Sequence, residues 1–378
     1  MTLAGYATSR MAVAWKQAMT RFRYIAAIAA LGLACGTHPA ACSRGEKVKI
    51  AVMTRLQSGS TVGSSEVNAS KLFLEERGVR NIEIVPFNDD WEPERAVEAY
   101  TEMRAQGLRV LITSHVSTCA LALRESINRD RVLTMVTGSA TDELSGSDDY
   151  SFRNVQDVRT EQKSIAGYVN GLPGGSLLVI RDTDNHSYTT PALRYFLAGL
   201  EKPSVRVIDF SVASLDTAAL AAEIRKQAFD NVYMLVGGYK VVAGTIAQMA
   251  KKASPGARIV FTPWMKTPAL LRTLGGAVKD SVMPSHYPPR RESKAVDEYV
   301  SGFKSRFGYA PTFISLNVYT ALEILSAAIA EGNTTPDEIK SYLLKTKSFE
   351  TRFGEVVFDA YGDVTKPLYF ITDLENEF

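Results

Sequence analysis

The chain has 378 residues, more than a single hydrophobic core usually serves, so at least two lobes are expected. Apolar residues make up 46% of the chain and charged residues 22%, as in ordinary soluble globular proteins. A net charge of +2, without basic runs, argues against nucleic acid as a partner.

Residues 1–46 are predicted to be a leader outside the fold. Two arginines precede a short apolar stretch at 24–34 and then Cys35, which is the order of a secretory signal. The stretch is too short for a membrane-spanning helix, which takes about 20 residues. Its end is similar to a lipoprotein cleavage box in which Cys35 is lipidated, although Gly32 stands where that box usually has leucine. We therefore expect an exported protein, either periplasmic or held to the membrane only by a lipid on Cys35.

From residue 47 onward, strand-like and helix-like runs alternate. The predicted strands lie at 48–53, 82–87, 110–113, 132–136, 177–180, 205–211, 232–236 and 259–261. The predicted helices lie at 66–76, 94–105, 119–128, 160–170, 191–200, 217–229, 241–252, 297–307 and 317–330. Such alternation predicts an α/β fold with parallel sheets. Because a polar connector at 145–158 separates two sets of strands, we expect two doubly wound lobes with a ligand cleft between them.

The most informative stretch contains two apolar runs, 110–113 and 132–136, each followed by a cluster of Ser, Thr and Gly. If both runs are parallel strands, the polar turns meet at the same edge of the sheet, where ligands of such folds bind. Thr118, Ser139 and Thr141 then bring hydroxyl and backbone N–H groups to one place, which suits a small carboxylate. The alternative is that these residues only cap helices.

Aromatic residues follow three strands of the second set. Tyr188, Tyr239 and Trp264 are expected at the cleft, with Tyr188 offering an aromatic wall and a hydroxyl. The alternatives are plain strand-to-helix turns for Tyr239 and the edge of the core for Trp264.

Sequence signatures of catalysis or metal binding are absent. The chain has no G-x-S-x-G elbow and no phosphate-binding loop. Cys42 and Cys119 predict neither a disulfide framework nor a zinc site. No feature joins His115, His186 or His286 to an activated serine, and the alternating acids before His186 have no further metal ligand. We expect no enzyme, cofactor or metal.

Taken in chain order, the motifs resemble the leucine/isoleucine/valine-binding protein family, the type I periplasmic binding proteins of ABC importers. The resemblance covers residues 47–378 and rests on the segments KIAVMTRLQSGS, HVST, TGSATDEL, RDTDNHSY, GGY and FGEVVFDAYGD. It implies two lobes joined by a multi-strand hinge, lobe 1 from 47–156 and 287–352 and lobe 2 from 157–286 and 353–378.

The resemblance also implies roles for the candidate residues. Thr118 would bind the ligand carboxylate, and the backbone carbonyl of Ser139 would contact the α-amino group. Thr141 would contact both groups, and Tyr188 and Tyr239 would close over the ligand. The ligand would pass to the membrane subunits of an ABC permease.

Several positions depart from the family pattern. Trp264 stands where amino-acid-binding members have a glutamate for the ammonium group, and Asp142, Asp182 or Asp184 are left as substitutes. Trp91 and Ser117 occupy the positions of a disulfide found in some members. The sequence therefore leaves open a branched-chain or other amino acid, an aromatic or aliphatic carboxylate that lacks an amine, and a ligand sensor of the same fold.

Overall fold

The computed structural model describes residues 47–56 and 61–378. The predicted leader, with the lipidation candidate Cys35, lies outside the described residues. The fold below is that of residues 47–378.

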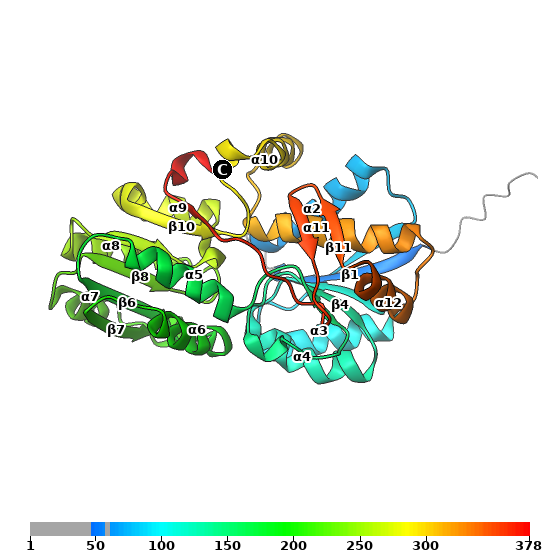
Figure 1. Ribbon diagram of the computed structural model, residues 1–378, viewed down its shortest axis with the longest axis horizontal. Coiled ribbons are helices and arrows are strands. Elements are labelled where there is room, and N and C mark those ends of the chain that lie inside the picture. The colour runs from blue at the N-terminus through cyan, green and yellow to red at the C-terminus, as the bar shows by residue number, and fades with distance from the viewer. Residues whose placement is uncertain (1–46, 57–60) are drawn as a thin grey trace, which may run out of the picture. The chain divides into compact units, whose positions relative to one another are not determined.

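The first sheet has five parallel strands in the order β2-β1-β3-β4-β5 (Figure 1). Its strands are β1 Val48–Thr54, β2 Ile82–Asn88, β3 Val110–Thr113, β4 Leu133–Val136 and β5 Ser151–Arg153. The connecting helices are α2 Thr61–Arg77, α3 Pro93–Ala105 and α4 Ser117–Arg129. The interior strand β1 is fully buried from Ile50 to Met53, because helices cover both faces of the sheet.

The second sheet has six strands in the order β13-β10-β9-β8-β6-β7. They are β6 Ser176–Asp182, β7 Ser204–Phe210, β8 Asn231–Leu235, β9 Arg258–Phe261, β10 Ser281–Ser285 and β13 Tyr369–Ile371, and only β13 runs antiparallel. The helices are α5 Val158–Asn170, α6 His186–Ala198, α7 Thr217–Arg225, α8 Val242–Ala253 and α9 Pro268–Leu274. The predicted fold class, two doubly wound lobes, is confirmed.

The chain continues through α10 Lys294–Phe307, α11 Phe313–Ala330, α12 Pro336–Thr346 and the antiparallel hairpin β11 Ser348–Thr351 with β12 Gly354–Val357. Helix α11 is long and apolar enough to cross a membrane, but it is mostly buried and packs against α2, as a core helix does. The hairpin spans residue 352, where the sequence placed a lobe boundary. The boundaries stay a prediction.

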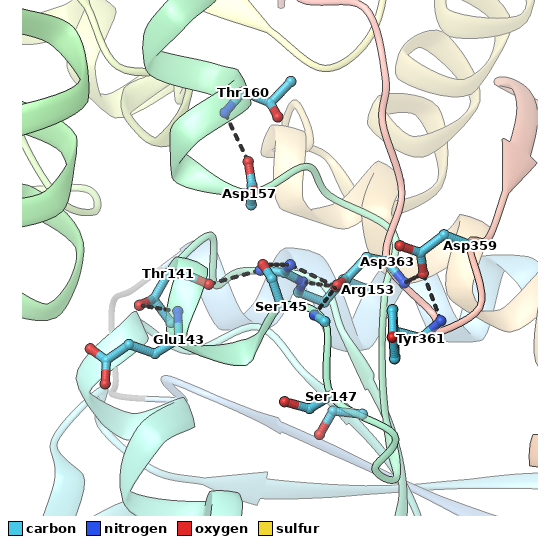
Figure 2. Close-up of polar contacts among 12 residues, drawn as sticks. Thr141, Glu143, Ser145, Ser147, Arg153, Asp157, Thr160, Asp359, Tyr361 and Asp363 are labelled. Atoms are coloured by element: carbon cyan, nitrogen blue, oxygen red, sulfur yellow. Dashed lines mark hydrogen bonds and ion pairs between the residues drawn. The ribbon is translucent and has the colours of Figure 1, made fainter. Parts of the chain in front are cut away.

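Three segments connect elements near the first sheet with elements near the second. They are residues 154–157 after β5, residues 286–293 after β10 and residues 358–368 between β12 and β13. Arg153, at the end of β5, links the loop after β4 to the third of these segments (Figure 2). Its guanidinium donates to the Thr141 carbonyl (2.8 Å), the Ser145 hydroxyl and the Asp363 carboxylate (Nε to Oδ1, 2.8 Å). Because Arg153 is only 2% exposed, this ion pair is shielded from water.

The sequence missed several elements. Strand β5 lies inside the predicted connector, and β10 and β13 were not expected, because all three are short and lack a strand-like alternation. Helix α6 begins at His186, five residues before the predicted start at Pro191. The proline is accommodated inside the helix, at the loss of one backbone hydrogen bond.

Candidate ligand-binding site

A cavity lies at the carboxyl ends of both sheets, and the space in it together with the open solvent at its mouth is about 420 Å³. Its walls come from the loops after β2, β3, β4, β6, β8 and β9, together with the starts of α2 and α11. The residues that line it are Val62, Trp91, Ser114, Val116, Ser117, Gly138, Ala140, Asn185, Tyr188, Gly237, Gly238, Tyr239, Trp264, Thr267, Thr312, Phe313 and Ile314. We call it the inner cavity.

A second cavity of about 810 Å³ adjoins the inner one and is called the outer cavity. The two share Trp91, Val116, Asn185 and the turn at 237–239. Charged side chains line the outer cavity: Arg55, Asp90, Glu92, Asp184 and Lys240. Among the described residues, none of Asp, Glu, Lys or Arg lines the inner cavity. The site is therefore apolar and aromatic inside and charged at its outer end.

Aromatic rings form the inner end. Trp264 packs edge-to-face against Tyr188 and Phe313, with ring centroids 6.1 and 5.9 Å apart. Trp264 also packs against the buried imidazole of His286, with the two ring centroids 5.4 Å apart. Burial lowers the pKa of His286 to about 3, so this ring is neutral and adds no charge behind the cavity.

The Tyr188 hydroxyl points away from the cavity into a buried polar network. It donates to Glu161, and Gln162 Nε2 donates to it at 3.1 Å. Tyr233 in turn donates to Gln162 Oε1 at 2.8 Å. Tyr188 therefore offers the ligand its ring, whereas the sequence had expected a wall with an available hydroxyl.

Two buried carboxyl groups form hydrogen bonds to residues that line the inner cavity. Glu161 contacts Tyr188, and Glu66 on α2 accepts a hydrogen bond from the Ser114 hydroxyl. Burial raises the pKa of each to about 8, so both are mainly protonated at neutral pH. A sequence pattern gives no sign of this, because a glutamate on a helix is usually exposed.

The predicted site residues fall into two groups. Tyr188, Tyr239 and Trp264 line the inner cavity, and Thr118 lines the outer one. Ser139 and Thr141 line neither cavity in the described part of the chain. The Ser139 hydroxyl donates to the His115 carbonyl at 2.8 Å, and the Thr141 hydroxyl accepts from Glu143 N. Their roles toward a ligand stay predictions.

Helix α4 brings backbone donors to the boundary of the two cavities. It begins at Ser117, and its cap residue, Val116, makes no side-chain capping bond. The N–H groups of Ser117 and Thr118 belong to the first turn, so they have no partner within the helix. This helix start suits an anion. The carboxylate-binding role of Thr118 stays a prediction.

The candidate partners for a ligand ammonium lie outside the inner cavity. Asp142 accepts from the Tyr195 hydroxyl at 2.6 Å, a contact between the loop after β4 and helix α6. Asp182 is buried and accepts from Gly237 N, and Asp184 forms an ion pair with Lys240 at 3.1 Å. No group of three His, Cys, Asp or Glu side chains that could hold a metal occurs in the described ranges.

Three polar residues that line the inner cavity were not predicted from the sequence. The Trp91 Nε1, Asn185 Oδ1 and Thr312 Oγ1 atoms are buried and have no hydrogen-bond partner among the described residues. Of these three residues, only Asn185 has a sequence signal, because it comes just before a helix. Thr312 arrives from the start of α11, far along the chain.

A two-lobed α/β fold with a cavity at the carboxyl ends of both sheets is typical of solute-binding proteins. The chain belongs to the periplasmic binding protein family, whose family model matches residues 47–375.

Relatives agree with this assignment. The chain is 22% identical over 326 residues to the Leu/Ile/Val-binding protein homolog 1 of Brucella abortus, covering 85% of this chain and 86% of the relative. Among solved structures, it is similar to the branched-chain amino acid transporter substrate binding protein of Streptococcus pneumoniae in complex with isoleucine (TM-score 0.77, 20% identity, 86% and 96% coverage). It is also similar to a solute binding protein of Rhodopseudomonas palustris in complex with 3,4-dihydroxybenzoic acid (TM-score 0.73, 18% identity, 86% and 92% coverage).

Proposed function

We propose that this protein binds a small carboxylate with an aromatic or branched apolar body and no amine. The observation that carries the proposal is the inner cavity, which has aromatic walls and, among the described residues, no charged lining side chain. An ammonium group placed there would lose its water without gaining an anion, which is costly. The structural neighbour that holds 3,4-dihydroxybenzoic acid supports a ligand of this kind.

The polar groups at the boundary of the two cavities give the ligand an orientation. The carboxylate would accept from the first N–H groups of α4 and from the Thr118 hydroxyl, with Arg55 and Lys240 in the outer cavity beyond. The apolar body would extend inward, toward Tyr188, Trp264 and the start of α11.

An amino acid is the second candidate, supported by the names of the relatives and by the complex with isoleucine. In that case backbone carbonyls, such as that of Ser139, would have to serve the ammonium group. A thermal-shift screen of benzoate, 3-phenylpropionate and 4-methylpentanoate beside leucine and phenylalanine separates the two candidates. The proposal fails if only the amino acids raise the melting temperature.

Replacing Thr118 with alanine is expected to weaken binding of the preferred ligand by about 1–3 kcal/mol, because a hydrogen bond to a charged group is lost. The fold should survive, since Thr118 is half-buried and lies in the first turn of α4. Calorimetry measures the loss, and Thr217→Ala, in the first turn of α7, is the matched control. Unchanged affinity would remove Thr118 from the site.

In the cell, we infer that the protein is exported and delivers its ligand to the membrane subunits of an ABC permease. The leader sequence and the family support this inference. We propose Cys35 as the lipid anchor. Wild-type protein should then incorporate labelled palmitate, and Cys35→Ser should not. Absence of label from the wild type would leave a freely periplasmic protein.

A further inference from the structure

The turn that carries Trp91 has an unusual backbone. Asp90 and Trp91 have φ angles of +49° and +61°, in the left-handed region that residues other than glycine rarely enter. Two such residues in succession need support from their surroundings, and conformations of this kind gather at functional sites. The contacts that stabilise this turn, and the position that it gives the Trp91 side chain, therefore bear on function.

Asp89 holds the turn. It is fully buried, and its Oδ1 accepts the backbone N–H of Trp91 at 3.1 Å. Its Oδ2 lies 2.9 Å from Nδ1 of His115, which is also buried. Since His115 follows β3, the pair fixes the turn after β2 to the loop that leads into α4.

Asn88 adds to this support from the other side of the turn. Its Oδ1 accepts the backbone N–H of Asp90 at 3.3 Å and that of Leu56 at 2.7 Å. The carbonyl of Asp89 accepts the N–H of Glu92 at 2.9 Å. The backbone on both sides of Trp91 is thus tied down.

The turn places the Trp91 side chain where the inner and outer cavities meet, since Trp91 lines both. The opposite wall there is Gly238. A Cβ built on Gly238 would lie 3.3 Å from Val116 Cγ1, a tight contact, and 3.9 Å from Trp91 Cζ3, an ordinary one, so Gly238 lies next to the indole ring, and its φ of +136° disfavours any residue with a side chain. The indole N–H is buried and has no partner in the part of the chain that the structure describes.

We propose that Trp91 binds the ligand, with its indole N–H donating to the carboxylate, and that Asp89 and His115 are the residues that position it. The inference rests on the proposed function and adds to it. An indole N–H can only donate, so it suits a carboxylate oxygen and cannot serve an ammonium group. The ring lies beside Gly238 where the two cavities meet, so its N–H would reach the carboxylate at the position proposed for it.

The test compares variants by calorimetry with 3-phenylpropionate. Trp91→Phe keeps an aromatic ring and removes the donor, and we expect affinity about tenfold to a hundredfold lower. Tyr361→Phe, at an exposed ring, is the control and should bind as the wild type does. Trp91→Phe with wild-type affinity would overturn the inference.

A second set of variants tests the positioning pair. His115→Leu removes the group that faces Asp89, and His115→Asn restores a donor. We expect affinity to fall in the first and to recover in part in the second. With 5-fluorotryptophan labelling, the Trp91 fluorine resonance should shift or broaden in His115→Leu, while that of Trp264 stays in place. If neither the affinity nor the resonance changes, the pair has no positioning role.

The outcomes separate this inference from the proposed function. If the wild type binds leucine and not 3-phenylpropionate, the amine-free ligand is wrong. Trp91→Phe is then measured with leucine, which carries the same carboxylate, and an undiminished affinity overturns the inference. A wild type that binds none of the acids or amino acids overturns both.

Discussion

Replacing Arg153 with methionine is expected to lower the free energy of unfolding by about 3–5 kcal/mol, because it removes the buried cation of an ion pair and three hydrogen bonds of its guanidinium. Arg153 donates to Thr141, Ser145 and Asp363 (Figure 2). Methionine replaces the aliphatic part of the arginine side chain and removes the guanidinium, so most of the loss reports the polar interactions.

Urea unfolding measures this loss. The control is Arg225→Met at an exposed position on α7, which should change the unfolding free energy by no more than about 0.5 kcal/mol. A loss below about 1 kcal/mol for Arg153→Met would mean that the contact between β5, the loop after β4 and segment 358–368 does not depend on this ion pair.

Raising the pH from 6.5 to 8 is expected to destabilise the protein through Glu66 and Glu161. Their folded-state pKa of about 8 lies above the ordinary value of 4.5, so in this window the native state binds protons that the unfolded state has released. The unfolding free energy therefore falls as the pH rises, by about 1.4 kcal/mol per pH unit for each carboxyl well below its folded pKa, and levels off above pH 8.

The range from pH 6.5 to 8 lies between the pH ranges in which two other buried groups change the unfolding free energy. His286, with its pKa lowered to about 3, favours the folded state as the pH rises toward 6.5, and Lys366, lowered to about 8, does so above pH 8. The carboxyl contribution is isolated by comparing the wild type with Glu66→Gln, Glu161→Gln and the double variant. Each substitution should flatten the slope. An unchanged slope in the double variant would show that both carboxyls titrate normally.

The strands and the first-lobe turns could be predicted because their signals are local. The apolar runs at 110–113 and 132–136 each carry their own polar turn, so the chain order alone puts Thr118 at the edge of a sheet. Tyr188, Tyr239 and Trp264 were found by the same rule, and all three line the inner cavity.

The remaining parts of the site depend on long-range packing. Thr312 and Phe313 come from α11, which reaches the cavity by packing against α2. Trp91 is positioned by a strained turn and by Asp89, and neither has a sequence pattern. Glu66 and Glu161 look like surface residues of helices until the tertiary fold buries them.

The most direct test of the central claim is calorimetry with two matched pairs, 3-phenylpropionate against phenylalanine and 4-methylpentanoate against leucine. The members of each pair differ only in the α-amino group. The inner cavity predicts that the acid binds at least about tenfold more tightly in one pair or both, because none of the described Asp or Glu residues lines this cavity to pair with an ammonium group. Tighter binding of the amino acid in both pairs would contradict the account and assign an amino acid to this cavity.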